Sequence, residues 1–243
     1  MTFAQHVINF NRNLHWTGGA LPAGIRILNP FQESEQAMGI CETFYNKYYN
    51  DTRKRHIIMG INPGRFGGGL TGIPFTDPKR LRQECGIAYE GRDTHETSSV
   101  FVYEAINAFG GPEVFYRQFY INSVCPLGFT TIDARGREKN YNYYDSKQLT
   151  EASYQFIIES MEKQLSFGIH TDVGFCFGTG KNEKFLKELN AKYRFFDRIV
   201  ALEHPRFIMQ YKTASKQLYI DKYMAAFNDV AERLGGTSVD SAR

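Results

Sequence analysis

The sequence contains few cysteines, and their spacing excludes the common cysteine-bound cofactors. Cys41, Cys85, Cys125 and Cys176 lie far apart and form no CxxC or Cys/His pair. Zinc sites and iron–sulfur clusters need closely spaced ligands. We therefore interpret the cysteines as reduced thiols and predict neither a metal nor another cofactor.

Long apolar runs, internal repeats and Pro-rich linkers are absent as well. No stretch approaches the length of a membrane span, and residues 1–6 lack the charged and apolar regions of a signal peptide. We therefore expect a cytoplasmic protein with no membrane partner. We also expect a single domain over residues 1–234, followed by a polar, disordered tail at 235–243.

Charge of either sign is not in large excess. The net charge of +3 permits contact with a polyanion without requiring it. The 15 Tyr and 20 Phe residues give many aromatic rings. Most should fill the core, although some could stack on bases.

Four short apolar runs predict buried strands, and segments of helical periodicity alternate with them. The runs are residues 56–61, 119–124, 173–177 and 199–202, and the helical segments are 3–14, 33–49, 98–109, 146–167, 182–192 and 215–234. This alternation predicts an α/β protein with a parallel sheet covered by helices on both faces.

Polar or small residues follow each predicted strand, at the edge where parallel sheets bind ligands. They are Asn62, Ser123 with the Cys-Pro pair at 125–126, the Gly-Thr-Gly run at 178–180, and His204. The segment 130–145 is polar and tyrosine-rich, with three basic residues, and predicts a long surface loop. A solvated connector is favoured there over a segment that follows a phosphate backbone.

The loop after the first strand, Gly-Ile-Asn-Pro-Gly at 60–64, could be simply a turn. The glycines at 67–69 and the run Thr-Gly-Ile-Pro-Phe at 71–75 oppose that interpretation, because dense glycine lets backbone amides approach a ligand. The loop is not a P-loop, since the Gly-Lys-Ser/Thr ending is missing.

Residues 60–75 resemble, without a gap, the first motif of the single-strand-selective monofunctional uracil-DNA glycosylases, in the uracil-DNA glycosylase superfamily. That motif reads Gly-x-Asn-Pro-Gly-x-Phe-Gly and then Thr-Gly-x-Pro-Phe, and the chain matches it at ten positions. Cys-Pro-Leu at 125–127 and His-Pro at 204–205 resemble the end of the family's middle strand and its second catalytic motif. The resemblance covers about residues 56–212.

The resemblance implies a three-layer αβα sandwich with a central, mostly parallel four-stranded sheet. It also implies cleavage of the N-glycosidic bond of a damaged base flipped out of single- or double-stranded DNA. Asn62 would position the attacking water, because an amide is too weak a base to remove a proton. His204 would donate to the base as it leaves as an anion. A histidine that only caps a strand end is the alternative.

The resemblance also assigns base-binding residues. Backbone groups around Ile61 and Gly64 could contact the base, and Phe75 would stack on it, although a core phenylalanine is the alternative. Uracil-only relatives carry a bulky Tyr where this chain has Gly64, so room is left for a substituent such as hydroxymethyl. Where the family has a base-reading Asn, this chain has Ser123, with Asn122 one place earlier. A rotating hydroxyl predicts a broader or altered base range that includes xanthine.

A second departure follows His204, where residues 206–212 replace the family's Ser-Pro. In the family this loop wedges into the duplex, and Arg206 and Phe207 are the candidates for that role. Arg65 is a further candidate DNA contact. Lys181 lies at a predicted helix start, where phosphate binding and helix capping are equally favoured. These departures indicate a divergent second branch of the family.

No motif places a lysine as a Schiff-base nucleophile, so the reaction implied is monofunctional excision in base-excision repair. We expect a monomer that acts in the cytoplasm, at the bacterial nucleoid. The alternatives are a module that binds a flipped base or nucleotide without cleaving it, and a nucleoside or nucleotide hydrolase of the same fold. A pure binder needs no combination of Asn62 with His204.

Overall fold

A parallel sheet of four strands forms the centre of the computed structural model, which describes residues 1–235. The strands are β2 (His56–Gly60), β3 (Phe119–Ser123), β6 (Val173–Phe177) and β7 (Arg198–Leu202). Their order is β3-β2-β6-β7, and all neighbouring pairs are parallel. The predicted sheet is therefore confirmed. Strands β2, β3 and β6 are buried throughout, which explains why they are almost continuously apolar.

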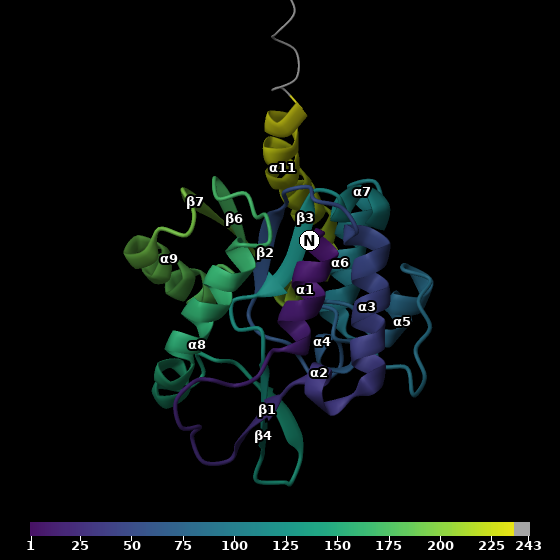
Figure 1. The fold of residues 1–243 in the computed structure, drawn as a ribbon. Coiled ribbons are helices and arrows are strands. Elements are labelled where there is room, and N and C mark those ends of the chain that lie inside the picture. Colours follow the sequence, from purple (N-terminus) through teal and green to yellow (C-terminus); the bar gives the residue numbers. More distant parts are fainter. Residues whose placement is uncertain (236–243) are drawn as a thin grey trace, which may run out of the picture.

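Helices cover both faces of this sheet, so the predicted three-layer sandwich is also confirmed (Figure 1). Consecutive residues of β3 point to opposite faces of the sheet and so contact the two helical layers. Tyr120 packs on Phe3 and Tyr45, whereas Phe119 packs on Phe227. The helices are α1 (Phe3–Arg12), α2 (Pro30–Glu33), α3 (Glu35–Tyr49), α4 (Gly68–Thr71), α5 (Pro78–Gln83), α6 (Thr97–Ala108), α7 (Pro112–Tyr116), α8 (Lys147–Leu165), α9 (Lys181–Tyr193), α10 (Pro205–Tyr211) and α11 (Lys216–Gly235), with a 3-10 turn at Thr213–Ser215.

A second, antiparallel sheet corrects the prediction of a surface loop at residues 130–145. It consists of β1 (Ile25–Leu28), β4 (Gly128–Ile132) and β5 (Glu138–Tyr141), in the order β1-β4-β5. Asp133 closes the β4–β5 turn by accepting from the backbone N–H groups of Arg135 and Arg137. Strand β5 is partly exposed, so its polar residues concealed its periodicity. Figure 1 shows β1 and β4 together at one end of the molecule.

The segment after His204 is also not the loop that residues 206–212 led us to expect. It forms helix α10, with His204 as N-cap and Pro205 in the first turn. Proline suits that position because the first helical N–H groups have no partner within the helix. The predicted tail at 235–243 lies outside the described residues, except for Gly235 at the end of α11.

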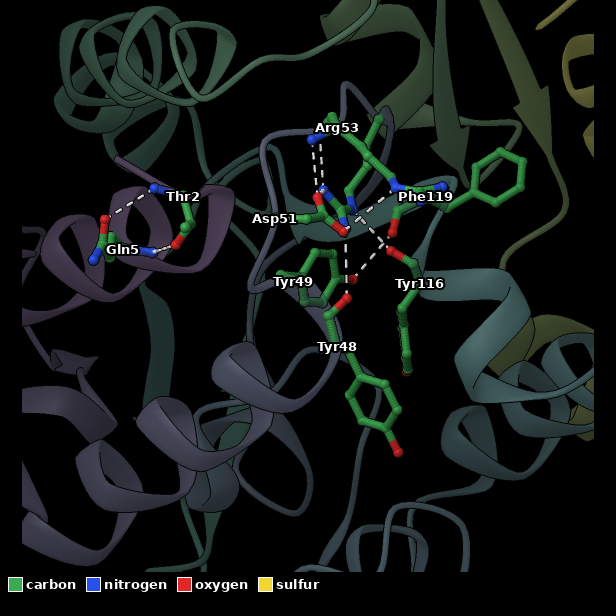
Figure 2. A network of polar contacts seen from close by, with 9 residues as sticks. Thr2, Gln5, Tyr48, Tyr49, Asp51, Arg53, Tyr116 and Phe119 are labelled. Carbon is green, nitrogen blue, oxygen red and sulfur yellow. Dashed lines mark hydrogen bonds and ion pairs between the residues drawn. The ribbon is translucent and has the colours of Figure 1, made fainter.

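The amino-terminal edge of the sheet is anchored by the fully buried Arg55. Its guanidinium donates to Asp51 and to the backbone oxygens of Tyr116, Arg53 and Tyr48. Figure 2 shows this network of polar contacts. The guanidinium also lies 4.7 Å from the ring centroids of both Phe3 and Tyr49. A buried charge with this many partners holds β2 in place from the end opposite the cavity described below. Within residues 1–235, no helix is long and apolar enough to cross a membrane.

Candidate active site

A cavity of about 290 Å³ lies at the carboxyl ends of the central strands. Many of the residues singled out in the sequence line it. These are Ile61, Asn62, Gly64, Phe75, Ser123, His204, Arg206 and Phe207. Asn122, Arg65 and Lys181 are not among the lining residues. The fold therefore brings the ends of β2, β3 and β7 to one place, as expected for a parallel sheet.

His204 is held by the first turn of α10. Its Nδ1 accepts a hydrogen bond from the backbone N–H of Arg206, at 3.1 Å. The acceptor must be unprotonated, so the neutral ring carries its proton on Nε2. Burial, helped by the positive charge of Arg206, lowers the pKa of His204 to about 4. His204 is therefore a neutral donor at neutral pH, and the cap that it forms belongs to a helix and not to a strand end.

The carboxamide of Asn62 is held at both ends by the backbone at the end of β5 and just after it. Its Nδ2 donates to the backbone oxygen of Tyr141 at 3.2 Å, and its Oδ1 accepts from the backbone N–H of Tyr143 at 3.1 Å. These bonds fix which end of the amide is oxygen. The oxygen retains a second lone pair that can accept from a water molecule.

Phe75 has a strained backbone at the wall of the cavity. Its φ of 52° lies in the left-handed region, which non-glycine residues seldom occupy. The ring meets Phe177 edge-on at 5.4 Å and lies 5.8 Å from the ring of His204, between centroids. Gly60 allows this placement, because a Cβ there would lie 2.7 Å from the Phe75 ring. Strain of this kind is concentrated at functional sites.

Ser123 and Asn122 point to opposite faces of β3. Ser123 lines the cavity, whereas Asn122 donates to the hydroxyl of Tyr120 at 2.6 Å and accepts from the Ser123 N–H at 2.8 Å. Because side chains alternate along a strand, Asn122 cannot replace the missing asparagine of the family motif without a shift in register.

An acceptor and a donor converge next to Gly64. A Cβ at this position would lie 3.1 Å from Glu96 Oε1 and 3.2 Å from Asn140 Nδ2. Asn140 is oriented by its Oδ1, which accepts from the backbone N–H of Arg65 at 3.0 Å. A side chain larger than hydrogen at position 64 would have to displace one of these groups.

Glu96 is an acid whose ionisation lies near neutral pH. Burial raises its pKa to about 7, and the nearby Asp77 carboxylate acts in the same direction. The hydroxyl of Ser99 donates to Glu96 Oε2 at 3.2 Å and opposes the rise. The cavity therefore contains a carboxyl group that can change its charge at physiological pH.

Several lining residues were not found from the sequence. They are Glu96, Ser98, Asn140, Asn142, Gln210 and Tyr211. Asn140 and Asn142 have strand spacing and could have been recognised as sharing one face of a hairpin. Glu96 carries no comparable signal, because it reaches the cavity from the start of α6, far from the first motif in sequence.

The glycine-rich run serves packing more than ligand approach. A Cβ at Gly67 would lie 2.0 Å from Glu96 Oε2, and one at Gly69 would lie 2.8 Å from the backbone oxygen of Gly64. Gly68 is the member of the run that lines the cavity. The density of glycine therefore reflects how tightly the loop folds on Glu96 and on itself.

Two exposed aromatic side chains line the cavity, and two of the predicted DNA contacts, Arg65 and Lys181, lie against aromatic rings outside the lining. Phe207 and Tyr211 lie one turn apart on α10, are 41% and 65% exposed, and have ring centroids 5.6 Å apart. Arg65 stacks on Phe66, with its guanidinium 4.0 Å from the ring centroid. Lys181 begins α9, and its ammonium lies 5.8 Å from the Tyr144 ring.

A solved structure shares this architecture. The crystal structure of wild-type SMUG2 from Pedobacter heparinus superimposes on this chain with a TM-score of 0.94. The two sequences are 68% identical, and the match covers 96% of this chain and 99% of that chain. Two curated relatives are single-strand selective monofunctional uracil-DNA glycosylases. The Bos taurus protein is 29% identical over 34% of this chain and 37% of its own length, and the Rattus norvegicus protein is 25% identical over 55% and 52%. The chain thus spans between about a third and a half of these curated relatives.

The family assignment follows from a longer match. The sequence model of the uracil DNA glycosylase superfamily matches residues 46–228, from the end of α3 into α11. This range contains both strand-end motifs and all the lining residues described above, and it confirms the resemblance of residues 60–75. The chain belongs to the uracil DNA glycosylase superfamily.

Proposed function

We propose that this protein is a monofunctional DNA glycosylase that excises uracil and related damaged bases. The observation that carries the proposal is the pairing, in one cavity, of a neutral histidine donor with a fixed carboxamide and an aromatic face. These are His204, Asn62 and Phe75. The names of the curated relatives, uracil-DNA glycosylases, support the same activity.

The proposed reaction begins with a base rotated out of the DNA and stacked on Phe75. The C1′–N bond breaks, and its electron pair leaves with the base, which becomes an anion. The Nε2–H of His204 donates to the oxygen on which this charge develops. A donor aligned in advance with such an oxyanion lowers the activation barrier by about 2.7–4 kcal/mol.

Asn62 would then orient the water that completes hydrolysis. Its oxygen accepts one hydrogen of the water and directs the water oxygen to C1′, where the new bond forms. The second proton of the water neutralises the departing base through solvent. The products are a free base and an abasic site, and no lysine is required.

We further propose that the cavity accepts bases with additional polar groups. Gly64 leaves space beside the base, and Glu96 with Asn140 offers an acceptor and a donor at that point. Ser123 adds a hydroxyl that can serve either role. These features support 5-hydroxymethyluracil and xanthine as additional substrates.

The exposed rim supports DNA as the partner, in single- and double-stranded form. Phe207 on α10 is the proposed wedge, and Arg206 next to it carries a charge that suits the phosphate backbone. An apolar side chain inserted at the emptied position in the stack would lower the cost of flipping the base.

Labelled oligonucleotides test the proposal. Single- and double-stranded forms would carry uracil, 5-hydroxymethyluracil, xanthine or hypoxanthine, and alkali would convert abasic sites into strand breaks. We expect strand breaks for uracil in both forms, and their loss in the double variant Asn62→Ala/His204→Ala. Binding without breaks would establish a binding module. Release of base from free deoxyuridine, with no breaks in DNA, would establish a nucleoside hydrolase.

A further inference from the structure

Three potential metal ligands meet at the edge of the sheet opposite the cavity. His56 opens β2, and His170 and Asp172 precede β6. One ligand atom from each lies within 4.8 Å of the others. His56 Nε2 lies 3.0 Å from Asp172 Oδ1, and the two imidazole rings stack with centroids 4.6 Å apart.

The backbone holds these residues together independently of their side chains. The N–H of His170 donates to the oxygen of Arg55 at 2.9 Å, and the N–H of Arg55 donates to the oxygen of Gly168 at 3.0 Å. His56 is 1% exposed, whereas His170 is partly buried and Asp172 is exposed. The cluster is therefore rigid on its inner side and open to solvent on its outer side, which allows an ion to enter.

The side chains are of the types that hold a divalent cation. An imidazole binds a metal through an unprotonated ring nitrogen, and a carboxylate binds it through an ionised oxygen. The cluster supplies two such rings and one such carboxylate.

The ring of His56 presents Nε2 to the cluster, where the exposed Asp172 carboxylate is its one hydrogen-bond partner. The other ring nitrogen, Nδ1, is buried away from the cluster. Two imidazoles and a carboxylate form the donor set that divalent first-row metals use in many proteins.

We propose that His56, His170 and Asp172 bind a divalent transition-metal ion of the zinc type. The ion replaces the proton that His56 Nε2 shares with Asp172, and this proton passes to the other ring nitrogen of His56. Small rotations of the His170 and Asp172 side chains bring the ligand atoms to the separation of about 3.3 Å that tetrahedral zinc requires. Water completes the coordination on the exposed side.

The bound ion would link His56, at the start of β2, to His170 and Asp172, in the segment between α8 and β6. It would stabilise the folded protein without entering the chemistry of the cavity, which lies at the other end of the same strands. The proposal is independent of the glycosylase activity. No sequence pattern indicated the site, because positions 56 and 170–172 meet only in the folded chain.

Zinc titration of the metal-free protein tests the site. After EDTA treatment and its removal, calorimetry with Zn²⁺ should show one saturable site per chain. His170→Gln and Asp172→Asn should each weaken binding by at least the roughly 10–100-fold that loss of even an outer-shell partner costs. With zinc ~100-fold above Kd, the wild-type Tm should rise by about 5–10 °C, and the variants should show little rise.

Two histidine variants serve as controls. His15→Gln removes an exposed histidine, and His204→Gln removes the histidine of the cavity. Both should bind zinc as the wild type does. Co²⁺ should give visible absorption bands in the wild type and lose them in His170→Gln, while circular dichroism shows that the variant is folded. Three results would each overturn the proposal. They are the absence of saturable binding in the wild type, wild-type affinity in both His170→Gln and Asp172→Asn, and loss of the site in His204→Gln.

Discussion

The Nδ1 atom of His204 accepts a hydrogen bond from the backbone N–H of Arg206, and this one contact determines which ring nitrogen can serve the substrate. The helix start leaves its N–H groups without partners, so a side-chain acceptor is stabilising at that position. The proton must then reside on Nε2. The local folding of α10 therefore fixes the tautomer that the proposed reaction needs.

Replacement of His204 should separate catalysis from capping. In His204→Ala we expect the single-turnover rate on uracil-containing DNA to fall by about 10²–10³-fold, as when one oxyanion donor is removed. The lost cap should also cost about 1 kcal/mol of stability. In His204→Asn the amide oxygen can still accept from Arg206, so stability should recover more than the rate. An unchanged rate in His204→Ala would contradict the assigned role.

Glu96 should make stability depend on pH near neutrality. Its pKa rises from the ordinary value of 4.5 to about 7 on folding, so the folded protein binds the proton more tightly than the unfolded chain. The resulting stabilisation is complete below the unfolded pKa and is lost as pH rises through 7. Glu96→Gln should lack this loss, so its stability relative to the wild type should increase with pH.

Urea unfolding at about pH 5 and about pH 8 measures that difference. Glu113→Gln, an exposed position on α7, is the matched control and should follow the wild type at both pH values. His204 contributes in the opposite sense, because its folded pKa of about 4 lies below the ordinary value of 6.5, and its stabilisation is lost as pH falls through that interval. A constant difference between Glu96→Gln and the wild type would refute the prediction.

Gly64→Ala should narrow the range of bases. The added methyl group would lie 3.1 Å from Glu96 Oε1, so the carboxyl must shift by a few tenths of an ångström and the space for a substituent decreases. We expect excision of 5-hydroxymethyluracil to fall more than excision of uracil. Gly39→Ala on α3, where a Cβ meets no atom within 4 Å, is the control. Equal losses for both bases would argue against a substituent site at Gly64.

Ser123→Asn should shift base preference toward that of the family, because an amide offers a donor and an acceptor in fixed positions. Asn122→Ser changes the neighbouring residue on the opposite face of β3, so it should alter packing against Tyr120 and leave base preference unchanged. Competition between uracil- and xanthine-containing duplexes provides the measurement. If Ser123→Asn keeps the wild-type ratio, the hydroxyl is not a determinant.

Phe207→Ala should weaken action on duplex DNA more than on single strands, because only a duplex needs a wedge to replace the flipped base. Leu218→Ala removes another exposed apolar side chain, 67% exposed on α11, and should change neither activity. The ratio of single-turnover rates on the two forms is the measured quantity. A parallel fall on both forms would indicate a role in substrate binding instead of wedging.

The strands and their order of appearance followed from local patterns. The apolar runs at 56–61 and 173–177 could hardly be anything but buried strands, and polar residues at their ends marked the site. The hairpin β4–β5 and helix α10 escaped prediction for a physical reason. Polar residues dominate β5, and α10 is short enough for its capping histidine to be interpreted as a strand end.

The sequence by itself determined which chemical groups stand at the strand ends, because burial of apolar strands and the period of side chains are local properties. Tertiary structure decided how those groups are held. Asn62 is oriented by Tyr141 and Tyr143, which lie 79 and 81 residues away, and Glu96 reaches Gly64 from the start of α6. Such long-range hydrogen bonds form only when separate elements pack together, so no local pattern records them.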